Sequence, residues 1–469
     1  MIPPLRRARQ SLPRANSRGS LLIVAMLLSA VIAISLGSYI ALSRSSLKLA
    51  NRSFYSNASM NTAETGVEEA LWSFNQATGG AALATAWASP WNTSDGVTAH
   101  RTFTDFTLGS GVTAAVRVYV DNYNPTGSVQ PKVVAQSTIT MPTESLTLSK
   151  TIEVTLRRRS KFAMGLVAKN QITFRGNVAS VDSWNSLYDD SGALRATPVA
   201  YGAGVAHDHG SVGSTSVAVG SVAINNADIW GFASVGGNSS SGISVGSNGT
   251  VAAFGSPAGT VDTSRVATDF TANFDSTTMP AGGTVLASVG SSLGTVGATN
   301  TYTFAGQISS SLTIHGNVTL LLTAAAGSLA VKMSGGDLLT LDPGATLTIY
   351  TAADLQFTGN GISNPNNQAS TLQIWGTSTS TTPQSIDIGG GATVNALIYA
   401  PDGNVTIRGT PDVTGSVVAD NIDVTGSAKF HYDESLANWG GNNPFGVVKW
   451  RELVSAGDRA AYSSVLNSW

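Results

Sequence analysis

Two neighbouring histidines are the residues best suited to chemistry in this sequence. His207, Asp208 and His209 stand together in a glycine-rich stretch. Two imidazoles two residues apart can bind a metal ion from one face of a strand, if a carboxylate such as Asp189 or Asp190 lies near them in space. However, no spacing among the five histidines of the chain matches a zinc or metalloprotease motif. We therefore interpret this group as a solvated loop.

A second group offers oxygen ligands of the kind that calcium prefers. Asp121, Asn122 and Asn124 lie directly before Pro125. Their spacing is not that of an EF-hand loop. Polar residues followed by proline are typical of turns, so the pattern predicts a turn here.

A third group, His431 with Asp433 and the many other aspartates, could imitate a β-helix glycosidase or lyase. Such enzymes need paired carboxylates, or a basic residue beside bound calcium, on one face of the fold. The sequence cannot place these residues on one face, and it contains no nucleophile elbow, P-loop or Rossmann fingerprint. We therefore expect no enzyme activity, no catalytic, cofactor-binding or metal-binding residues, and no cofactor.

The composition predicts mainly β-structure with tight turns. The 469 residues include 50 glycines, only 12% are charged, and cysteine is absent. Glycine supplies the backbone angles of tight turns, and the absence of cysteine means that packing alone must hold the fold together. No basic patch indicates nucleic acid as a partner.

An apolar stretch near the N-terminus, residues 20–43, organises the chain. Its 24 residues contain no charge, and a helix of this length spans roughly 36 Å, enough to cross a membrane. Five arginines and no acidic residue precede it, so the N-terminal end is expected on the cytoplasmic side of an inner membrane and the remainder outside. A removable signal peptide is the alternative, but this run is longer than such signals and lacks a clear cleavage site.

The junction before this stretch resembles a known processing signal. Arg18, Gly19 and Ser20, followed by the apolar run, are similar to the class III signal of type IV pilins and type II secretion pseudopilins. This resemblance implies that a prepilin peptidase cuts after Gly19 and leaves Ser20 as the new N-terminus. Most major pilins carry glutamate five residues into the mature chain, where this sequence has Val24. That difference is tolerated in PilX-type minor pilins and in the tip pseudopilin.

The helix is expected to continue to about residue 78, because glycines 79 and 80 supply the first stop signal. Small residues such as Gly37 permit close packing between helices of neighbouring subunits. A segment common in PilX-type proteins is similar to residues 61–71, through Ala63, Glu64, Gly66, Ala70 and Leu71. Four strand-like runs follow at residues 100–108, 112–123, 132–141 and 145–158. A long helix followed by an antiparallel meander is the order of a pilin-like head, with the second half of the helix across one sheet face.

Short β-rich runs separated by glycine, asparagine or aspartate turns fill residues 162–432. They favour an all-β, right-handed β-helix or solenoid, with a β-sandwich as the alternative. Irregular spacing between residues 258 and 300 indicates an insertion, with a short helix near residues 264–274. Phrases such as residues 181–186, 399–401, 430–436 and 450–453 are similar to the exported domain of many PilX-type proteins.

These patterns predict five parts: a basic leader (1–19), a long helix (20–78), a pilin-like sheet domain (79–160), a β-solenoid-like domain (161–436) and a C-terminal segment (437–469). The resemblance implies a minor pilin or pseudopilin-like structural protein, with Gly19 and Ser20 for processing and Val24, Gly37 and Glu64 for helix assembly. Its expected partners are other pilin or pseudopilin subunits, prepilin peptidase and the inner membrane. The alternative is a membrane-tethered surface adhesin or β-helix carbohydrate-active enzyme.

Overall fold

A computed structural model describes residues 17–109, 111–125, 130–141, 146–176, 178–440 and 443–468. Most of the predicted basic leader, residues 1–16, lies outside the described residues. The chain forms two compact units. The first combines residues up to Ala77 with Ala81–Leu156 and Val447–Trp469, and the second holds Thr78–Gly80 and Arg157–Gly446. The second unit is therefore inserted into the sequence of the first.

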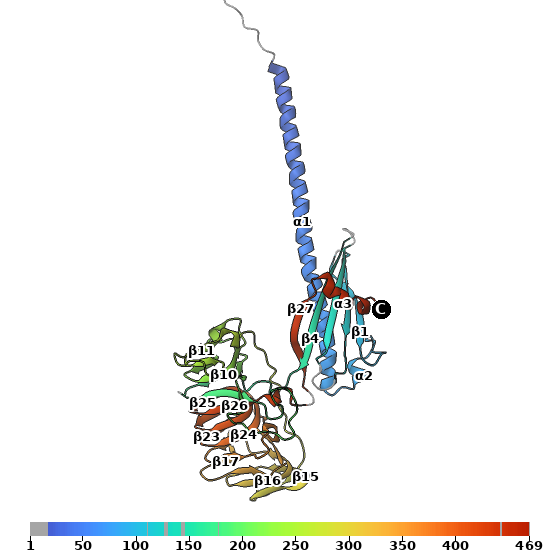
Figure 1. The fold of residues 1–469 in the computed structure, drawn as a ribbon. Helices are drawn as coiled ribbons and strands as arrows, with labels where there is room; N and C mark the ends of the chain where they lie inside the picture. The colour runs from blue at the N-terminus through green and yellow to red at the C-terminus, as the bar shows by residue number, and fades with distance from the viewer. Residues whose placement is uncertain are drawn as a thin grey trace, which may run out of the picture. The chain divides into compact units, whose positions relative to one another are not determined.

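The predicted long helix is α1 (Ser17–Thr78), which runs unbroken for 62 residues (Figure 1). It ends just before Gly80, whose φ of 100° lies in the left-handed region that stops helices. Its N-terminal part is long and apolar enough to cross a membrane. The large apolar side chains from Leu21 to Leu42 are exposed, so the described residues of this unit do not cover them.

The second half of α1 packs on a sheet through a stripe of mostly small residues. The buried members of the stripe are Ser59, Thr62, Ala63, Gly66, Val67, Ala70, Ser73 and Phe74. Their steps of one, three and four residues keep them on one helix face. Leu47 and Phe54, which precede this stripe in the helix, are both 63% exposed and do not belong to it. Packing on the sheet begins only near Tyr55 and Ala58.

The sheet of the first unit has the strand order β1 (Ala99–Thr107), β2 (Thr113–Val120), β3 (Lys132–Met141), β4 (Leu146–Arg158) and β27 (Phe445–Glu452). The first four strands pair as the predicted antiparallel meander. Alternate residues such as Val116 and Val118 face α1, as the period of two requires. The sequence analysis missed the fifth strand, β27, which pairs with β4.

The C-terminal residues cover the opposite face of this sheet. Helix α3 (Ala456–Leu466) places Leu466 with Leu453 and Val134 in a small apolar cluster. The separate C-terminal segment expected at residues 437–469 is therefore divided, since Val447–Trp469 complete the first unit. A short helix, α2 (Leu83–Ala86), precedes Trp87, whose ring packs edge-on against Phe74 of α1.

An ion pair ties β27 and α3 to β4. Arg451 donates to both carboxylate oxygens of the buried Glu153, at 2.9 and 2.8 Å, and the hydroxyl of Tyr462 donates to Oε2 at 2.5 Å. The hydrogen bonds from Arg451 and Tyr462 outweigh the effect of burial and lower the pKa of Glu153 to about 2.

The second unit is all β apart from short 3-10 helices. Its strands are β5 (Leu166–Phe174), β6 (Ser180–Trp184), β7 (Ala206–His207), β8 (Gly210–Ser214), β9 (Val222–Asn225), β10 (Asp228–Val235), β11 (Ile243–Val245), β12 (Thr250–Ala252), β13 (Val266–Ala267), β14 (Thr284–Val285), β15 (Ser292–Phe304), β16 (Leu312–Leu322), β17 (Leu329–Met333), β18 (Leu339–Leu341), β19 (Thr346–Thr351), β20 (Asp354–Phe357), β21 (Ile362–Ser363), β22 (Leu372–Gly376), β23 (Ser385–Gly390), β24 (Thr393–Gly409), β25 (Asp412–Gly426) and β26 (Lys429–Asp433). The 3-10 helices are η1 (Ser240–Gly242), η2 (Thr263–Arg265), η3 (Ala369–Thr371) and η4 (Glu434–Asn438).

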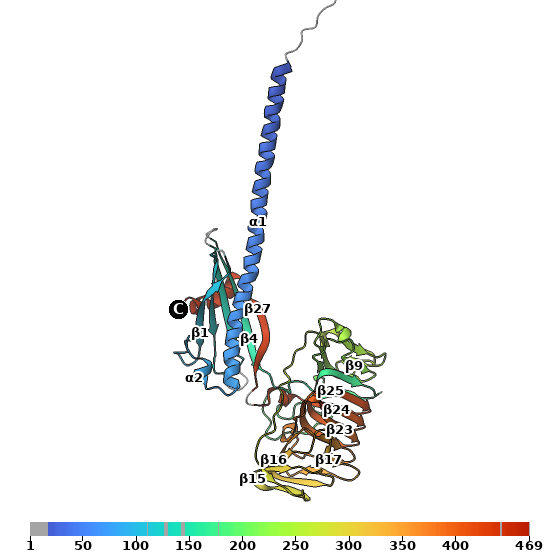
Figure 2. The same cartoon turned by 180° about the vertical axis from the view of Figure 1, so that it is seen from behind.

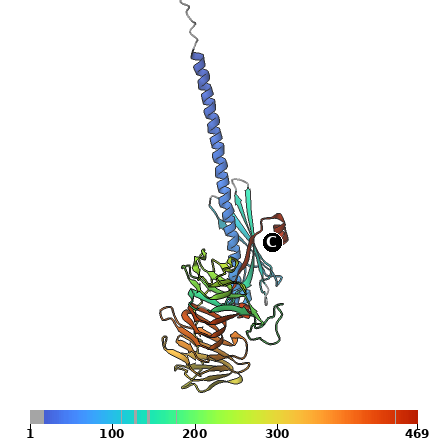
Figure 3. The ribbon, with the colours of Figure 1, turned by 60° about the vertical axis from the view of Figure 1, so that its left-hand side comes forward.

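The strands of this unit stack in long parallel ladders, as Figures 2 and 3 show for β23, β24 and β25 and their neighbours. One ladder runs β14–β15–β16–β19–β22–β24–β25–β5–β8–β10–β13. Sequence order and stacking order therefore differ, because β5 lies in the middle of the ladder beside the late strand β25. Six strands also form a closed ring in which each strand pairs with the next, in the order β5, β8, β10, β6, β26, β25 and back to β5.

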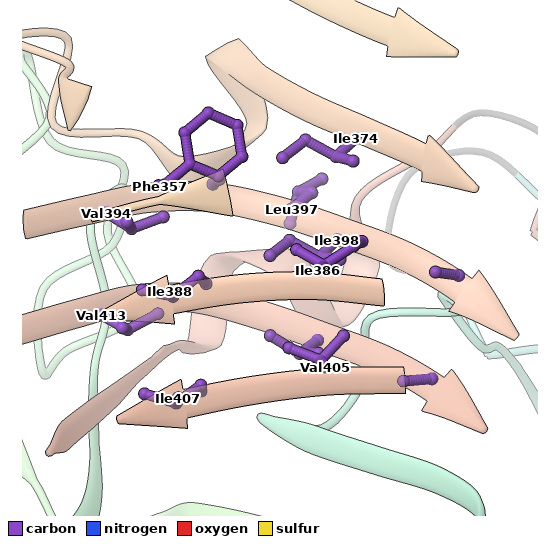
Figure 4. Packing of buried hydrophobic residues seen from close by; sticks show 14 of the residues in the cluster. Phe357, Ile374, Ile386, Ile388, Val394, Leu397, Ile398, Val405, Ile407 and Val413 are labelled. Atoms are coloured by element: carbon purple, nitrogen blue, oxygen red, sulfur yellow. The ribbon is translucent and has the colours of Figure 1, made fainter. Parts of the chain in front are cut away.

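The core of this unit is built by alternate residues of stacked strands. Ile386 and Ile388 of β23 lie over Val405 and Ile407 of β24, to which they pair in register (Figure 4). All four are at most 1% exposed. Branched apolar side chains at paired positions of neighbouring strands thus pack on one another in the interior.

The irregular region between residues 258 and 300 was partly misjudged from its sequence. The helix expected near residues 264–274 is only η2, and the segment after β13 is extended. Phe270 and Phe274 of this segment pack against the core, which explains an apolar spacing that imitates a helix. Not every short apolar run in residues 162–432 forms a strand: residues 217–219 lie outside the assigned strands, and Val217 and Val219 are 78% and 81% exposed.

Gly66 generates a first prediction, because α1 approaches β2 most closely there. A Cβ at Gly66 would lie 2.6 Å from Val118 Cγ2 and 2.8 Å from Val116 Cγ1, which is too close for carbon atoms that are not bonded. Because valine side chains are restricted at χ1, the two valines cannot easily turn away from it. Gly66→Ala should lower the stability of the first unit by about 1–2 kcal/mol, although alanine favours helices. Gly37→Ala is the matched control, since its Cβ would meet no atom within 4 Å. Hydrogen exchange of the β2 and β3 amides measures the effect, and equal exchange in both variants would contradict it.

Glu153 generates a second prediction about acid stability. Because its pKa is lowered to about 2, its stabilisation is present above the ordinary pKa of about 4.3 and is lost as the pH falls through about 2. Glu153→Gln should cost about 2 kcal/mol at pH 7, allowing for the partial exposure of Arg451, and almost nothing near pH 2. Calorimetry of both proteins across this range tests the prediction. A cost that does not change with pH would show that the charge of Glu153 is unimportant.

Candidate functional site

The residues predicted for processing and assembly all lie on α1. Gly19 and Ser20 belong to its N-terminal end. Val24 is 60% exposed, and the space around Gly37 is open. Glu64 is also exposed, pointing away from the sheet, whereas its neighbours Ala63 and Gly66 are buried against it. The similarity at residues 61–71 thus coincides with the small residues that let α1 approach the sheet.

The two histidines singled out by sequence do not lie in a free loop. His207 Nδ1 and His209 Nδ1 lie 2.9 and 3.1 Å from the same atom, Glu434 Oε1. His207 ends β7, and His209 immediately precedes β8. The expected solvated loop is limited to Asp208 and His209, which connect β7 to β8, because His207 belongs to β7 and pairs with β6. We call His207, His209 and Glu434 the histidine–carboxylate cluster.

Backbone pairing brings the three residues of this cluster together. β7 pairs antiparallel with β6, which places His207 opposite Ser183. Gly210 then lies so close to β6 and β10 that a Cβ would meet Asp182 Cα at 2.8 Å and Trp230 O at 2.9 Å, which fixes the path of the chain beside His209. Glu434 follows β26, which pairs in parallel with the other side of β6.

Further polar groups surround the histidine–carboxylate cluster. His207 Nε2 lies 3.2 Å from Asp190 Oδ1, and His209 Nε2 lies 3.9 Å from Asp208 Oδ1. Ser183 donates from Oγ to Glu434 Oε1 at 2.7 Å. Burial acts against the charged form of His207, but its contacts with Glu434 and Asp190 outweigh burial and raise its pKa.

A second group of polar residues is buried beneath this surface. His431 Nδ1 pairs with Asp182, and His431 Nε2 lies 3.1 Å from Asp412 Oδ1 without hydrogen-bond geometry. Tyr201 stacks on the imidazole with ring centroids 3.5 Å apart and donates to Asp182 Oδ2 at 2.6 Å. His431 is 2% and Asp182 6% exposed, so this ion pair lies inside the protein, whereas the side chain of Asp412 is 51% exposed.

Residues 185–205 cover the outer face of β6 and β26 and thereby bury the polar side chains on it. Trp184 of β6 contacts the Tyr201 ring edge-on and donates from its indole nitrogen to Val199 O at 3.2 Å. Ser186 donates from its backbone N and from Oγ to Asp433 at 3.0 and 2.7 Å. The segment is thereby fastened over the two strands as a cover.

Sequence reasoning found the histidines but missed their partners. Asp190 was a considered carboxylate, whereas Asp189 accepts hydrogen bonds within its own turn. Glu434, Ser183 and the buried Asp182 were not considered. The available signal was the pair of phrases at residues 181–186 and 430–436, whose polar residues fall in register across β6 and β26.

The calcium-type group near Pro125 is used for turns. Asp121 Oδ1 accepts the Lys132 backbone N–H at 2.7 Å, and Asn122 Oδ1 accepts that of Asn124 at 3.2 Å. Burial raises the pKa of Asp121, which makes this carboxylate a poorer cation ligand.

Comparison with known proteins gives two matches. A family model described as a domain of unknown function (DUF7305) matches residues 301–439, a range that includes His431 and Glu434 but neither His207 nor His209. Among solved structures, the chain is similar to the ice-binding protein_1 DUF3494 domain of Shewanella frigidimarina, with 16% identity and a TM-score of 0.26, covering 58% of this chain and 95% of that chain. At this TM-score, we infer neither the fold nor the function of this chain from the likeness. No curated protein sequence matches the chain.

The buried histidine generates a third prediction. Burial alone would lower the pKa of His431, but Asp182 and Asp412 outweigh burial and raise it. A raised pKa means that the stabilisation is complete below the ordinary value of about 6.5 and is lost as the pH rises through the raised value. The melting temperature of the second unit should therefore exceed that of His431→Gln most at about pH 5.5 and least at about pH 9. A difference that grows with pH would contradict the charged cluster.

Proposed function

We propose that this protein is a minor pilin or pseudopilin-like subunit, similar to PilX-type proteins of type IV pilus or type II secretion-like systems. The observation that carries the proposal is the division of α1 into two halves. The first half exposes a continuous apolar surface, whereas the second half is buried on an antiparallel sheet. Exposed apolar side chains over this length require either lipid or neighbouring helices as their surroundings.

In the proposed mechanism, α1 holds the subunit in the inner membrane before assembly and in the fibre afterwards. Prepilin peptidase removes the basic leader after Gly19, so that Ser20 becomes the N-terminus. Helices of adjacent subunits then pack through van der Waals contacts, for which the open surface at Gly37 allows close approach. The missing acidic side chain at Val24 favours a tip position, because this subunit offers no carboxylate to the N-terminus of a subunit ahead of it.

The second unit, in this proposal, is a right-handed β-solenoid presented outside the cell for assembly or adhesion. Parallel ladders of short strands around one apolar core support the solenoid interpretation. Its insertion between β4 and β27 supports a structural role as well, since the sheet that packs on α1 is complete only when the chain returns from this unit.

Processing and assembly provide the fourth prediction. The mature protein should begin at Ser20, and Gly19→Leu should block cleavage. Gly37→Leu should leave cleavage intact but reduce incorporation into fibres, because leucine prevents close helix packing. N-terminal sequencing and fibre immunolabelling measure these outcomes.

Three results would contradict the proposed function. An intact Met1, or cleavage beyond residue 43, would indicate an ordinary anchor or a removable signal. Even labelling along fibres at the abundance of a major subunit would argue against the tip position. Release of sugars from glycans by the purified protein would favour the alternative of a carbohydrate-active enzyme.

A further inference from the structure

We propose that the histidine–carboxylate cluster binds a divalent transition-metal ion of the zinc class through His207 Nδ1, His209 Nδ1 and Glu434 Oε1. One possible ligand atom from each of the three residues lies within 4.8 Å of the other two. The two nitrogen–oxygen distances, 2.9 and 3.1 Å, are close to the separation of about 3.3 Å between ligands of a tetrahedral zinc ion. Two imidazoles and a carboxylate, with a position left open, suit zinc better than calcium or magnesium.

The contacts of the two imidazoles support this assignment. The Nδ1 atoms of His207 and His209 both approach the same carboxylate oxygen, Glu434 Oε1, so that three ligand atoms converge on one place. The other ring nitrogen of His207 lies 3.2 Å from Asp190 Oδ1, whereas Nε2 of His209 lies 3.9 Å from Asp208 Oδ1, beyond hydrogen-bond distance. A metal ion on the Nδ1 side leaves the Nε2–H group of His207 to donate to Asp190.

The surrounding groups have the arrangement that supports metal ligands. Zinc-bound histidines usually donate their other ring nitrogen to a carboxylate, which fixes the tautomer and orients the ring. Asp208 is itself held by Arg265, which donates to its backbone oxygen at 2.7 Å and to Oδ2 at 3.0 Å. Ser183 holds Glu434 from the interior side.

The charge balance also favours a divalent cation. Glu434, Asp190 and Asp208 bring three negative charges, whereas Arg265, which pairs with Asp208, also pairs with Asp262. The carboxylates around the two imidazoles therefore leave an excess of negative charge, which a divalent ion would reduce. The His209 side chain is 57% exposed and that of His207 is 23% exposed, so an ion can reach the ligands from solvent.

A bound ion would fasten the early part of the second unit to its end. His207 and Glu434 are 227 residues apart in sequence and belong to segments on either side of β6. A metal ion that binds only the folded arrangement stabilises it by mass action. The open coordination position remains available to water or to a side chain of another molecule. This inference does not depend on the proposed role in a pilus.

The fifth prediction concerns the full-length protein, purified without a histidine tag and stripped with a chelator. It should bind one equivalent of Zn²⁺ in a calorimetric titration, and bound zinc should raise its melting temperature. Co²⁺ bound in place of zinc should give the visible absorption of a tetrahedral site. Asp190→Asn should weaken zinc binding by about 10- to 100-fold without changing the stoichiometry. His207→Ala, His209→Ala and Glu434→Gln should weaken it further.

His315→Ala is the matched control, because His315 Nδ1 also contacts a carboxylate, that of Asp342 at 2.5 Å, and its side chain is 33% exposed. It should bind zinc as tightly as the wild type does. The chelator-treated variants are also compared by circular dichroism, so that loss of binding is separated from loss of folding. The proposal is overturned if the wild type binds no more zinc than the folded double variant His207→Ala/His209→Ala, or if His315→Ala lowers the affinity equally.

Discussion

The parallel pairing of β6 with β26 is the contact on which the second unit depends. It joins segments about 250 residues apart and sets Asp182 beside His431 and Trp184 beside Asp433. The ladders become continuous because β25 and β26 lie against β5 and β6. The same register places Glu434 next to the two histidines and buries His431 beneath residues 185–205. A polar surface cluster and a buried charge cluster thus arise from one pair of strands.

In the first unit, the sheet has two different faces, and each has its own helix. Against α1 it presents valine and alanine, which allow the close approach at Gly66. On the other face, Glu153 is buried but charged, which is tolerable only because Arg451 and Tyr462 return to it from the end of the chain. The inserted unit therefore separates, in sequence, residues that the first unit needs together.

The parts predicted correctly from sequence are those with a clear period. α1 lacks proline and has a steady apolar pattern, β2 alternates strictly, and β3 and β4 alternate over part of their length. β27 was not predicted because four successive residues at its centre, including Val447 and Val448, are exposed, so the strand has no alternation to detect. The stacking order was also hidden, since every turn of a repetitive β-unit has the same kind of pattern and none specifies its neighbour. For that reason the histidines were visible in the sequence, whereas Glu434, whose position depends on stacking, was not.

Because the strands do not stack in sequence order, each unit is complete only when elements from late in the sequence have joined it. β25 and β26 cover one side of β5 and β6, and β27 with α3 covers β4 and Glu153. All of these covering elements follow residue 411, so they are synthesised after the strands that they cover. A chain that stopped before them would leave an open strand edge in one unit and an unpaired buried carboxylate in the other. Such edges and charges promote aggregation or proteolysis, so that chains lacking these elements are removed.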